Sequence, residues 1–218
     1  MRSRNSGPRS NAWSRSKYTN QTSFDPQLQE TGRIFELFFD DWTAADQTIY
    51  RQMPLHPDFL MPVTLDEVRE AVSQVPSQFT AGLEAIVLLG GSVRQRKAAK
   101  TYCYGRYMLC QVIVLHPFPK LMLRREFKRG LRPDIRVEYI RAGASVIEKN
   151  GARIVEFTES ALRDFYLRDV LMHEIGHHAD RKNLGKKPLR KEEGFADWFA
   201  LEYGFRLRGF AESKNADA

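Results

Sequence analysis

The sequence predicts an α+β fold, in which helical segments lie before and after a group of short strands. Three observations predict it. Apolar residues recur at three- and four-residue steps near the start, short runs rich in β-branched and aromatic residues fill the middle, and helical spacing returns near the end. A chain of 218 residues is long enough to bury a substantial core.

The composition is typical of a globular protein, with 42% hydrophobic and 28% charged residues. No run of apolar residues approaches the roughly 20 that a membrane-spanning helix needs. We therefore expect no membrane contact and a cytoplasmic location. The two cysteines, Cys103 and Cys110, lack the spacing of a zinc ribbon or a redox motif, so we expect free thiols in a reducing compartment. A structural disulfide is the alternative.

Residues 1–25 are predicted to form a disordered basic tail, because the first 24 residues contain five basic groups and no acidic one. No apolar segment follows this positive start, which argues against a signal peptide. An Arg- and Ser-rich start without acids also suits an organelle transit peptide.

Residues 26–80 are predicted to form an N-terminal helical segment. Within residues 27–53, apolar side chains have helical spacing. After a proline-rich connector, Thr64 can cap a second helix, with Glu67 at the capping-box position. The second helix continues with an apolar stripe, which consists of Leu65, Val68, Val72 and Val75.

Residues 81–210 are predicted to form the main domain, which begins with strands. Asn150-Gly151 indicates a tight hairpin turn between the last two of them. The segments with strand character are residues 85–89, 107–119, 135–140, 145–148 and 152–157. Helical patterns then cover residues 159–180 and 192–207, with a polar loop between them.

The chemistry of the chain is concentrated in the stretch LMHEIGHHAD, residues 171–180. His173 and His177 are four residues apart with Glu174 between them, in the pattern H-E-x-x-H. On a helix this spacing projects both imidazoles from one face, so that their nitrogens can bind one ion. Two imidazoles suit zinc better than Mg²⁺ or Ca²⁺.

A catalytic zinc site needs a third protein ligand and an open fourth position. The segment EEGFADWFA offers Glu193 as this ligand. Asp197, one helical turn further on, could then accept the other ring N–H of a histidine ligand. Glu192 and Asp180 are alternative third ligands. His178 projects about 100° away from His177, and we expect it to be hydrogen-bonded near the helix end.

H-E-x-x-H followed by E-x-x-x-D resembles the gluzincin arrangement of thermolysin-like peptidases. The short connecting loop and EEGFADWFA look more like the ImmA/IrrE type of small metallopeptidase. The resemblance covers residues 171–200 and implies a zincin-like fold, in which a small, mostly antiparallel sheet packs on the H-E-x-x-H helix and on a following ligand-bearing helix. In the matched run, Ala196, Phe199 and Ala200 agree, Asp197 stands where Asn is usual, and Phe195 replaces a Glu.

The resemblance also implies a function, that of a zinc-dependent metalloendopeptidase. His173, His177 and Glu193 would bind Zn²⁺, and Glu174 would be the general base that takes a proton from a zinc-activated water. The substrate would be a protein or peptide, which pairs with an edge strand formed by residues 111–119, unless this is a buried core strand. The candidates for oxyanion stabilisation, each with a structural role as the alternative, are Tyr203, Tyr166 and His116.

The net charge of +7 is concentrated in the middle of the chain, where residues 94–136 contain twelve Lys or Arg and two acids. Residues 94–100 and 123–132 could contact phosphates non-specifically, or recruit an acidic protein, or simply face solvent. No motif for sequence-specific readout accompanies them. A nucleic-acid- or protein-binding protein with a structural or vestigial zinc site is therefore the first alternative function, and a hydrolase of non-peptide amides is the second.

Overall fold

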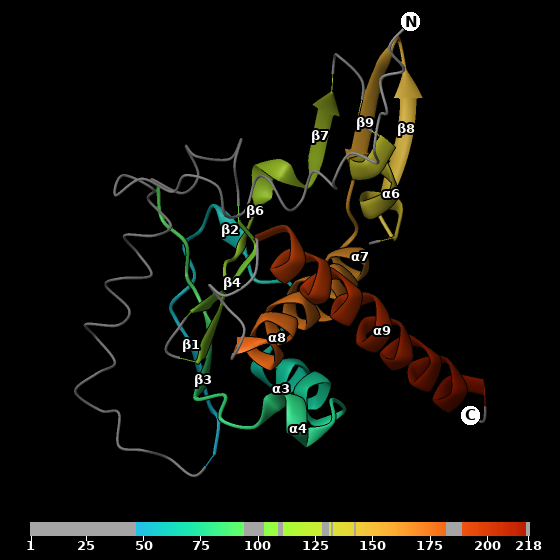
Figure 1. Ribbon diagram of the computed structural model, residues 1–218. Helices are drawn as coiled ribbons and strands as arrows, with labels where there is room; N and C mark the ends of the chain where they lie inside the picture. The colour runs from blue at the N-terminus through green and yellow to red at the C-terminus, as the bar shows by residue number, and fades with distance from the viewer. Residues whose placement is uncertain are drawn as a thin grey trace, which may run out of the picture.

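The computed structural model describes residues 47–93, 103–108, 111–127, 131, 133–141, 143–181 and 189–216. The predicted basic tail and the predicted helix up to residue 46 lie outside these residues, as does Cys110. The fold is a mixture of small sheets and helices (Figure 1), which confirms the predicted α+β class.

The main sheet has four strands in the order β1-β3-β5-β4. β1 (Ile49–Gln52), β3 (Ala85–Leu88) and β5 (Val112–Leu115) run parallel to one another. β4 (Gly105–Met108) runs antiparallel to β5 and forms an edge, because no other described strand pairs with it. This sheet is therefore mixed, and not mostly antiparallel as the sequence predicted.

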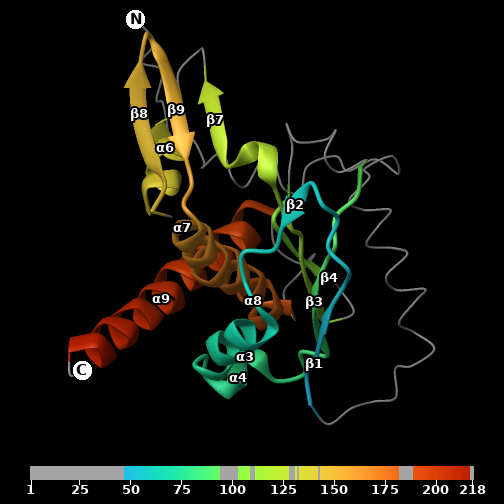
Figure 2. The same cartoon turned by 180° about the vertical axis from the view of Figure 1, so that it is seen from behind.

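Two smaller sheets are antiparallel. β2 (Phe59–Leu60) pairs with β6 (Phe118–Pro119), which a 3₁₀ turn at Lys120–Met122 follows. The other sheet stands apart from the main sheet (Figures 1 and 2) and has the order β7-β9-β8. Its strands are β7 (Arg124–Phe127), β8 (Ser145–Lys149) and β9 (Ala152–Glu156).

The helices around the main sheet come from both halves of the chain. α3 (Leu65–Ser73) and α4 (Ser77–Thr80) precede β3. α7 (Glu159–Asp164) continues through a π-helical stretch, Phe165–Val170, into α8 (Leu171–Ala179). α9 (Leu189–Ala216) packs against α8 and then extends away from the sheets (Figure 1).

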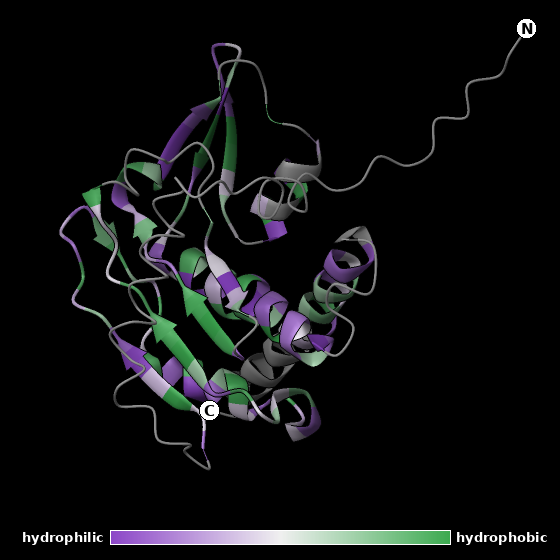
Figure 3. Ribbon diagram, turned by 60° about the vertical axis from the view of Figure 1, so that its left-hand side comes forward, coloured by the Kyte–Doolittle hydropathy of each residue, from purple (hydrophilic) through white to green (hydrophobic). Residues whose placement is uncertain are grey.

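The main sheet has two apolar faces. Its helix face contributes Ile86, Leu88, Ile113 and Leu115 to one core, together with Leu171, Met172 and Ile175 of α8. The far face is a separate buried cluster, which consists of Ala85, Val87, Leu89, Val112 and Val114. The sheet is accordingly hydrophobic along most of its central strands (Figure 3), as expected for strands that are buried on both sides.

Two local predictions are confirmed. Thr64 and Glu67 form a reciprocal capping box at the start of α3. Asn150 and Gly151 both have positive φ, 52° and 74°, in the turn between β8 and β9. These values are those of a type I′ turn, whose twist matches that of the flanking strands.

The strand predicted over residues 135–140 is wrong, because the structure forms helix α6 (Pro133–Arg141) there. Proline is favourable in a first helical turn, since its missing N–H needs no partner. Gly143, with φ of 80°, follows the end of the helix, as helix-terminating glycines commonly do. Val137 and Ile140 stay exposed, so the alternation did not reflect a buried strand face.

Two further segments differ from the prediction. Residues 49–52, expected to end a helix, form β1, where parallel pairing with β3 overrides local propensity. The single strand expected over residues 107–119 is divided between β4, β5 and β6, with Gln111 at φ of 63° in the turn after β4. Because β1 and α3 join the sheet and core of the later residues, residues 47–80 do not pack as a separate unit.

Among the described residues, no helix has the length and apolar character needed to cross a membrane.

Candidate metal centre

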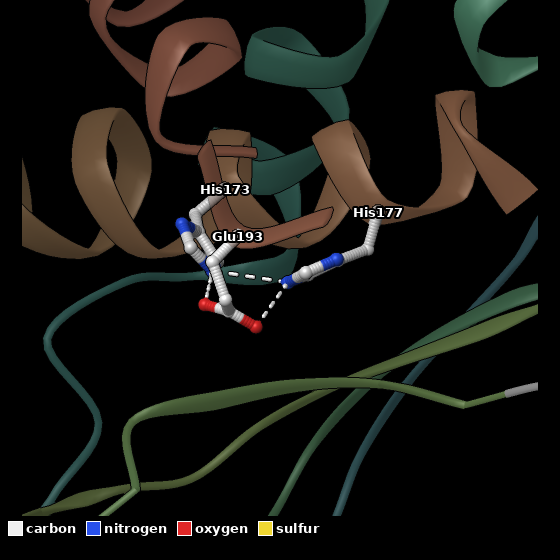
Figure 4. A group of neighbouring side chains, drawn as sticks. All are labelled: His173, His177 and Glu193. Atoms are coloured by element: carbon white, nitrogen blue, oxygen red, sulfur yellow. Dashed lines mark hydrogen bonds and ion pairs between the residues drawn. The ribbon is translucent and has the colours of Figure 1, made fainter. Parts of the chain in front are cut away.

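Two helices bring the predicted metal ligands together. His173 and His177 project from the same side of α8, and Glu193 reaches them from the first turns of α9 (Figure 4). All three residues are buried, with 4%, 6% and 2% of their surfaces exposed. Their ligand atoms lie within 4.8 Å of one another, and they are the group of described His, Cys, Asp and Glu residues that could hold an ion.

The spacing of these atoms suits a tetrahedral zinc ion. The Nε2 atoms of His173 and His177 are 3.1 Å apart, and each lies 3.6 Å from an oxygen of Glu193. Zinc binds nitrogen and oxygen at about 2.0–2.2 Å, so two ligands at tetrahedral corners are about 3.3–3.6 Å apart. Two neutral imidazoles and one carboxylate are also a ligand set that zinc accepts.

A second carboxylate of α9 orients one of the imidazoles. Asp197 Oδ1 lies 3.1 Å from His173 Nδ1. A carboxylate accepts, so the Nδ1 proton of His173 points to Asp197 and the lone pair of Nε2 points toward His177 and Glu193. This is the contact that the four-residue spacing from Glu193 to Asp197 predicted.

The approach of α9 to α8 depends on Gly176. A Cβ atom at this position would lie 2.8 Å from Ala196 Cα and 2.9 Å from Phe199 Cβ, too close for any other residue without a shift of the helices. The glycine lies between the two histidine ligands in the sequence. It therefore permits the interhelical contact that carries Glu193 to the imidazoles.

Glu174 is held by the edge strand β4. Its side chain is fully buried, and its Oε2 accepts a hydrogen bond of 2.7 Å from the backbone N–H of Tyr107 in β4. The strand approaches closely because Gly105 has no side chain. A Cβ there would lie 2.9 Å from Glu174 Cγ and 2.6 Å from Val170 Cγ1.

His178 holds the side chain of Tyr107, the residue whose backbone N–H donates to Glu174. Its Nε2 lies 3.1 Å from the carbonyl oxygen of Ala81, which can only accept, so Nε2 donates and Nδ1 faces the Tyr107 hydroxyl at 3.4 Å. Burial lowers the pKa of His178 to about 4, and the charge of Arg181 contributes. His178 is thus neutral and hydrogen-bonded, and it braces Tyr107 against α8.

The other predicted candidates lie outside the group of ligand atoms. Asp180 and Glu192 are both buried, and the backbone N–H of Asp180 donates to the carbonyl of Gly176 at the end of α8. Tyr166 is fully buried, and its hydroxyl donates to the carbonyl of His116. Tyr203 packs against Phe199 in an aromatic cluster, with the two rings tilted and their centroids 4.3 Å apart.

The sequence left residues 111–119 open between an edge strand and a buried core strand. Val112–Leu115 pairs on both sides, with β3 and β4, so the alternative of a buried core strand is the one observed. The edge nearest the candidate centre is β4, which contacts α8. Sequence reasoning also missed Tyr107, Gly105 and Gly176; the glycine inside H-E-x-x-H was the one visible signal of close helix packing.

The basic clusters are described only in part. Residues 94–100 lie outside the described residues. In the second cluster, Arg124 pairs with Glu156 at 2.6 Å, and the Arg125 guanidinium lies over the Phe127 ring at 5.2 Å. The first contact joins β7 to β9, and the second lies within β7.

Comparison with known proteins gives no match, either to a family model, to a curated protein or to a solved structure.

Proposed function

We propose that this protein is a zinc-dependent metalloendopeptidase. The observation that carries the proposal is the buried triangle of His173 Nε2, His177 Nε2 and a Glu193 carboxylate, with sides of 3.1–3.6 Å. Three ligands from two helices leave one tetrahedral position for water, as in catalytic zinc sites, whereas structural sites usually close with a fourth side chain.

The remaining residues would have separate roles. Zinc, when bound, supplies a Lewis acid that lowers the pKa of water and polarises a carbonyl group. Glu174, one residue after His173, would take the proton of the attacking water and give it to the leaving amine. Asp197 would hold His173 in the tautomer that binds metal.

The substrate would be an extended segment of a protein or peptide, and β4 is the strand placed to receive it. β4 is an edge strand among the described residues, and it contains Tyr107, whose backbone N–H donates to Glu174. An extended peptide can add to such an edge through backbone hydrogen bonds. We propose that the reaction takes place in the cytoplasm.

The test is the substitution Glu174→Gln, which removes the base and keeps the size of the side chain. We expect hydrolysis of a peptide library to fall by about 10²–10⁴-fold, the usual contribution of a general base, with zinc content unchanged. His173→Ala should lose both zinc and hydrolysis.

Full turnover by the Glu174→Gln variant would remove this residue from the mechanism. Stoichiometric zinc without hydrolysis in the unsubstituted protein, over a broad peptide library, would favour a binding protein with a structural zinc site.

A further inference from the structure

Arg106 occupies the strand next to the candidate centre but projects from the other side of the sheet. It lies in β4 between Gly105 and Tyr107, and its direct partner in β5 is Val114. Directly paired residues of antiparallel strands share a face. Because Val114 belongs to the far face, the guanidinium points away from α8 and from the metal ligands.

This guanidinium is buried and incompletely bonded. Arg106 is 7% exposed, and its Nε and Nη2 atoms have no hydrogen-bond partner in the part of the chain that the structure describes. Nε–H and Nη2–H lie parallel along one edge of the planar group. They form the fork that binds the two oxygens of a carboxylate at once.

The described surroundings offer this fork no negative charge. Of the described strand residues that share its face, Arg51 of β1, which pairs with Val87, is basic, and Ile49, Ala85, Val87, Met108, Val112 and Val114 are apolar. His116 is close enough for the charge of Arg106 to act on it. Burial lowers the pKa of His116 to about 3, and Arg106 contributes, so His116 is neutral at ordinary pH. Arg106 is thus the charged member of the pair.

A buried arginine without a counter-charge is costly. A buried lysine or histidine can lose its proton, but a guanidinium stays charged at any pH that a protein tolerates. Burial of an unpaired ion costs several kcal/mol, so such groups are almost always paired. The orphaned fork therefore indicates a missing anion.

We propose that Arg106 anchors a second binding site, distinct from the metal centre, for a small ligand with a single carboxylate group. One carboxylate balances one guanidinium and matches both free donors. A phosphate would bring an excess of negative charge into an apolar region. The site does not depend on the proposed peptidase activity, since its donors lie on the opposite side of the sheet from Glu174.

The test uses sodium acetate as the probe with the full-length protein. Acetate binding is measured by calorimetry and by thermal unfolding, at constant ionic strength set with NaCl, with sodium phosphate as a second probe. Arg106→Lys keeps the charge but loses the fork, and Arg106→Met removes both. Arg124→Met is the control for general charge effects, because Arg124 is an exposed arginine of β7. All variants keep the metal ligands, so acetate bound at zinc cancels in the comparison.

We expect acetate to bind about 10–100-fold more weakly to Arg106→Lys and Arg106→Met than to the unsubstituted protein and Arg124→Met, and phosphate to bind the unsubstituted protein more weakly than acetate does. Without acetate, Arg106→Met should unfold at a higher temperature than the parent, because it lacks a buried unpaired charge.

Equal acetate binding by all four proteins would overturn the proposal. A second result would also overturn it, namely that Arg106→Met is less stable than the parent by the same amount at every acetate concentration. Arg106 would then be paired within the chain. If Arg106→Met fails to fold, the comparison of acetate binding by Arg106→Lys and the parent decides.

Discussion

Glu193 and Asp197 are two carboxylates of one helix that would have different roles at the proposed metal ion. Both lie on the same side of α9, one turn apart. Glu193 is 2% exposed and reaches both imidazole Nε2 atoms, whereas Asp197 is partly exposed and reaches only the outer nitrogen of His173. Their contributions to zinc affinity should therefore differ in size.

We expect Glu193→Ala to weaken zinc binding most severely, because it removes a direct ligand. Asp197→Ala should weaken zinc binding by about 10–100-fold, the usual effect of losing the group that orients a ligand. Glu192→Ala is the matched control and should leave zinc affinity nearly unchanged. Competition with a chromophoric chelator measures all three, and an effect of Glu192→Ala as large as that of Glu193→Ala would refute the assignment.

His116 gives a prediction about pH. Its pKa is near 3 in the folded protein, because of burial and Arg106, against 6.5 in the unfolded chain. As pH falls below 6.5, the unfolded chain takes up a proton that the folded protein does not, so acid favours unfolding, and this loss continues down to about pH 3. Each pH unit costs up to about 1.4 kcal/mol.

Denaturant unfolding of the parent and of His116→Gln at pH 7 and pH 5 tests this. The parent should lose up to about 2 kcal/mol more than His116→Gln between these pH values. Parallel losses in the two proteins would show that the pKa of His116 is not lowered in the folded protein.

The site was more predictable from the sequence than the contacts that surround it. H-E-x-x-H and E-x-x-x-D place side chains on one helix face by spacing alone, and a helix keeps that relation in any fold. The partner of Glu174 is a backbone N–H of Tyr107, and any residue type could supply it. Tyr107 is the partner because its strand forms the edge of the sheet. Which strand forms the edge depends on pairings between distant segments.

At the scale of elements, two glycines each allow a close approach between two elements. Gly105 lets β4 approach Glu174 and Val170, and Gly176 lets α9 approach α8. The first approach positions Glu174, the proposed base, and the second positions Glu193, the proposed third ligand. Substitution of each by alanine should therefore separate catalysis from metal binding.

Gly105→Ala should lower peptide hydrolysis by about 10²-fold, the cost of a displacement near 1 Å at a reacting group, while zinc affinity stays close to that of the parent. Gly176→Ala should weaken zinc binding as well, because it moves the helix that carries Glu193. Gly194→Ala is the control, since a Cβ there meets nothing within 4 Å. Normal hydrolysis by Gly105→Ala would show that β4 does not position Glu174.

The elements that were wrongly predicted share a cause. Residues 135–140 alternate as a strand does, yet they form α6, in which Val137 and Ile140 are exposed. Residues 49–52 have helical spacing but become β1, because β3 offers a parallel partner. In both cases local pattern was ambiguous over few residues, and flanking residues or long-range pairing decided the outcome.

At the scale of the whole molecule, the main sheet lies between the proposed metal centre and the proposed carboxylate site. Its helix face packs on α8, which carries the proposed base and two of the proposed metal ligands, and its far face contains the buried guanidinium of Arg106. β4 contributes to both, since Gly105 and Tyr107 contact α8 and Arg106 projects from the far face.

The central claim is that His173, His177 and Glu193 bind one zinc ion. Elemental analysis of the full chain, purified without a histidine tag, tests it most directly. The account predicts about one zinc per chain, since three ligands within tetrahedral distances form one site; Glu193→Ala, purified in the same way, should retain much less. Absence of zinc from the unsubstituted protein after reconstitution with a zinc salt, or equal zinc in both proteins, would contradict the claim.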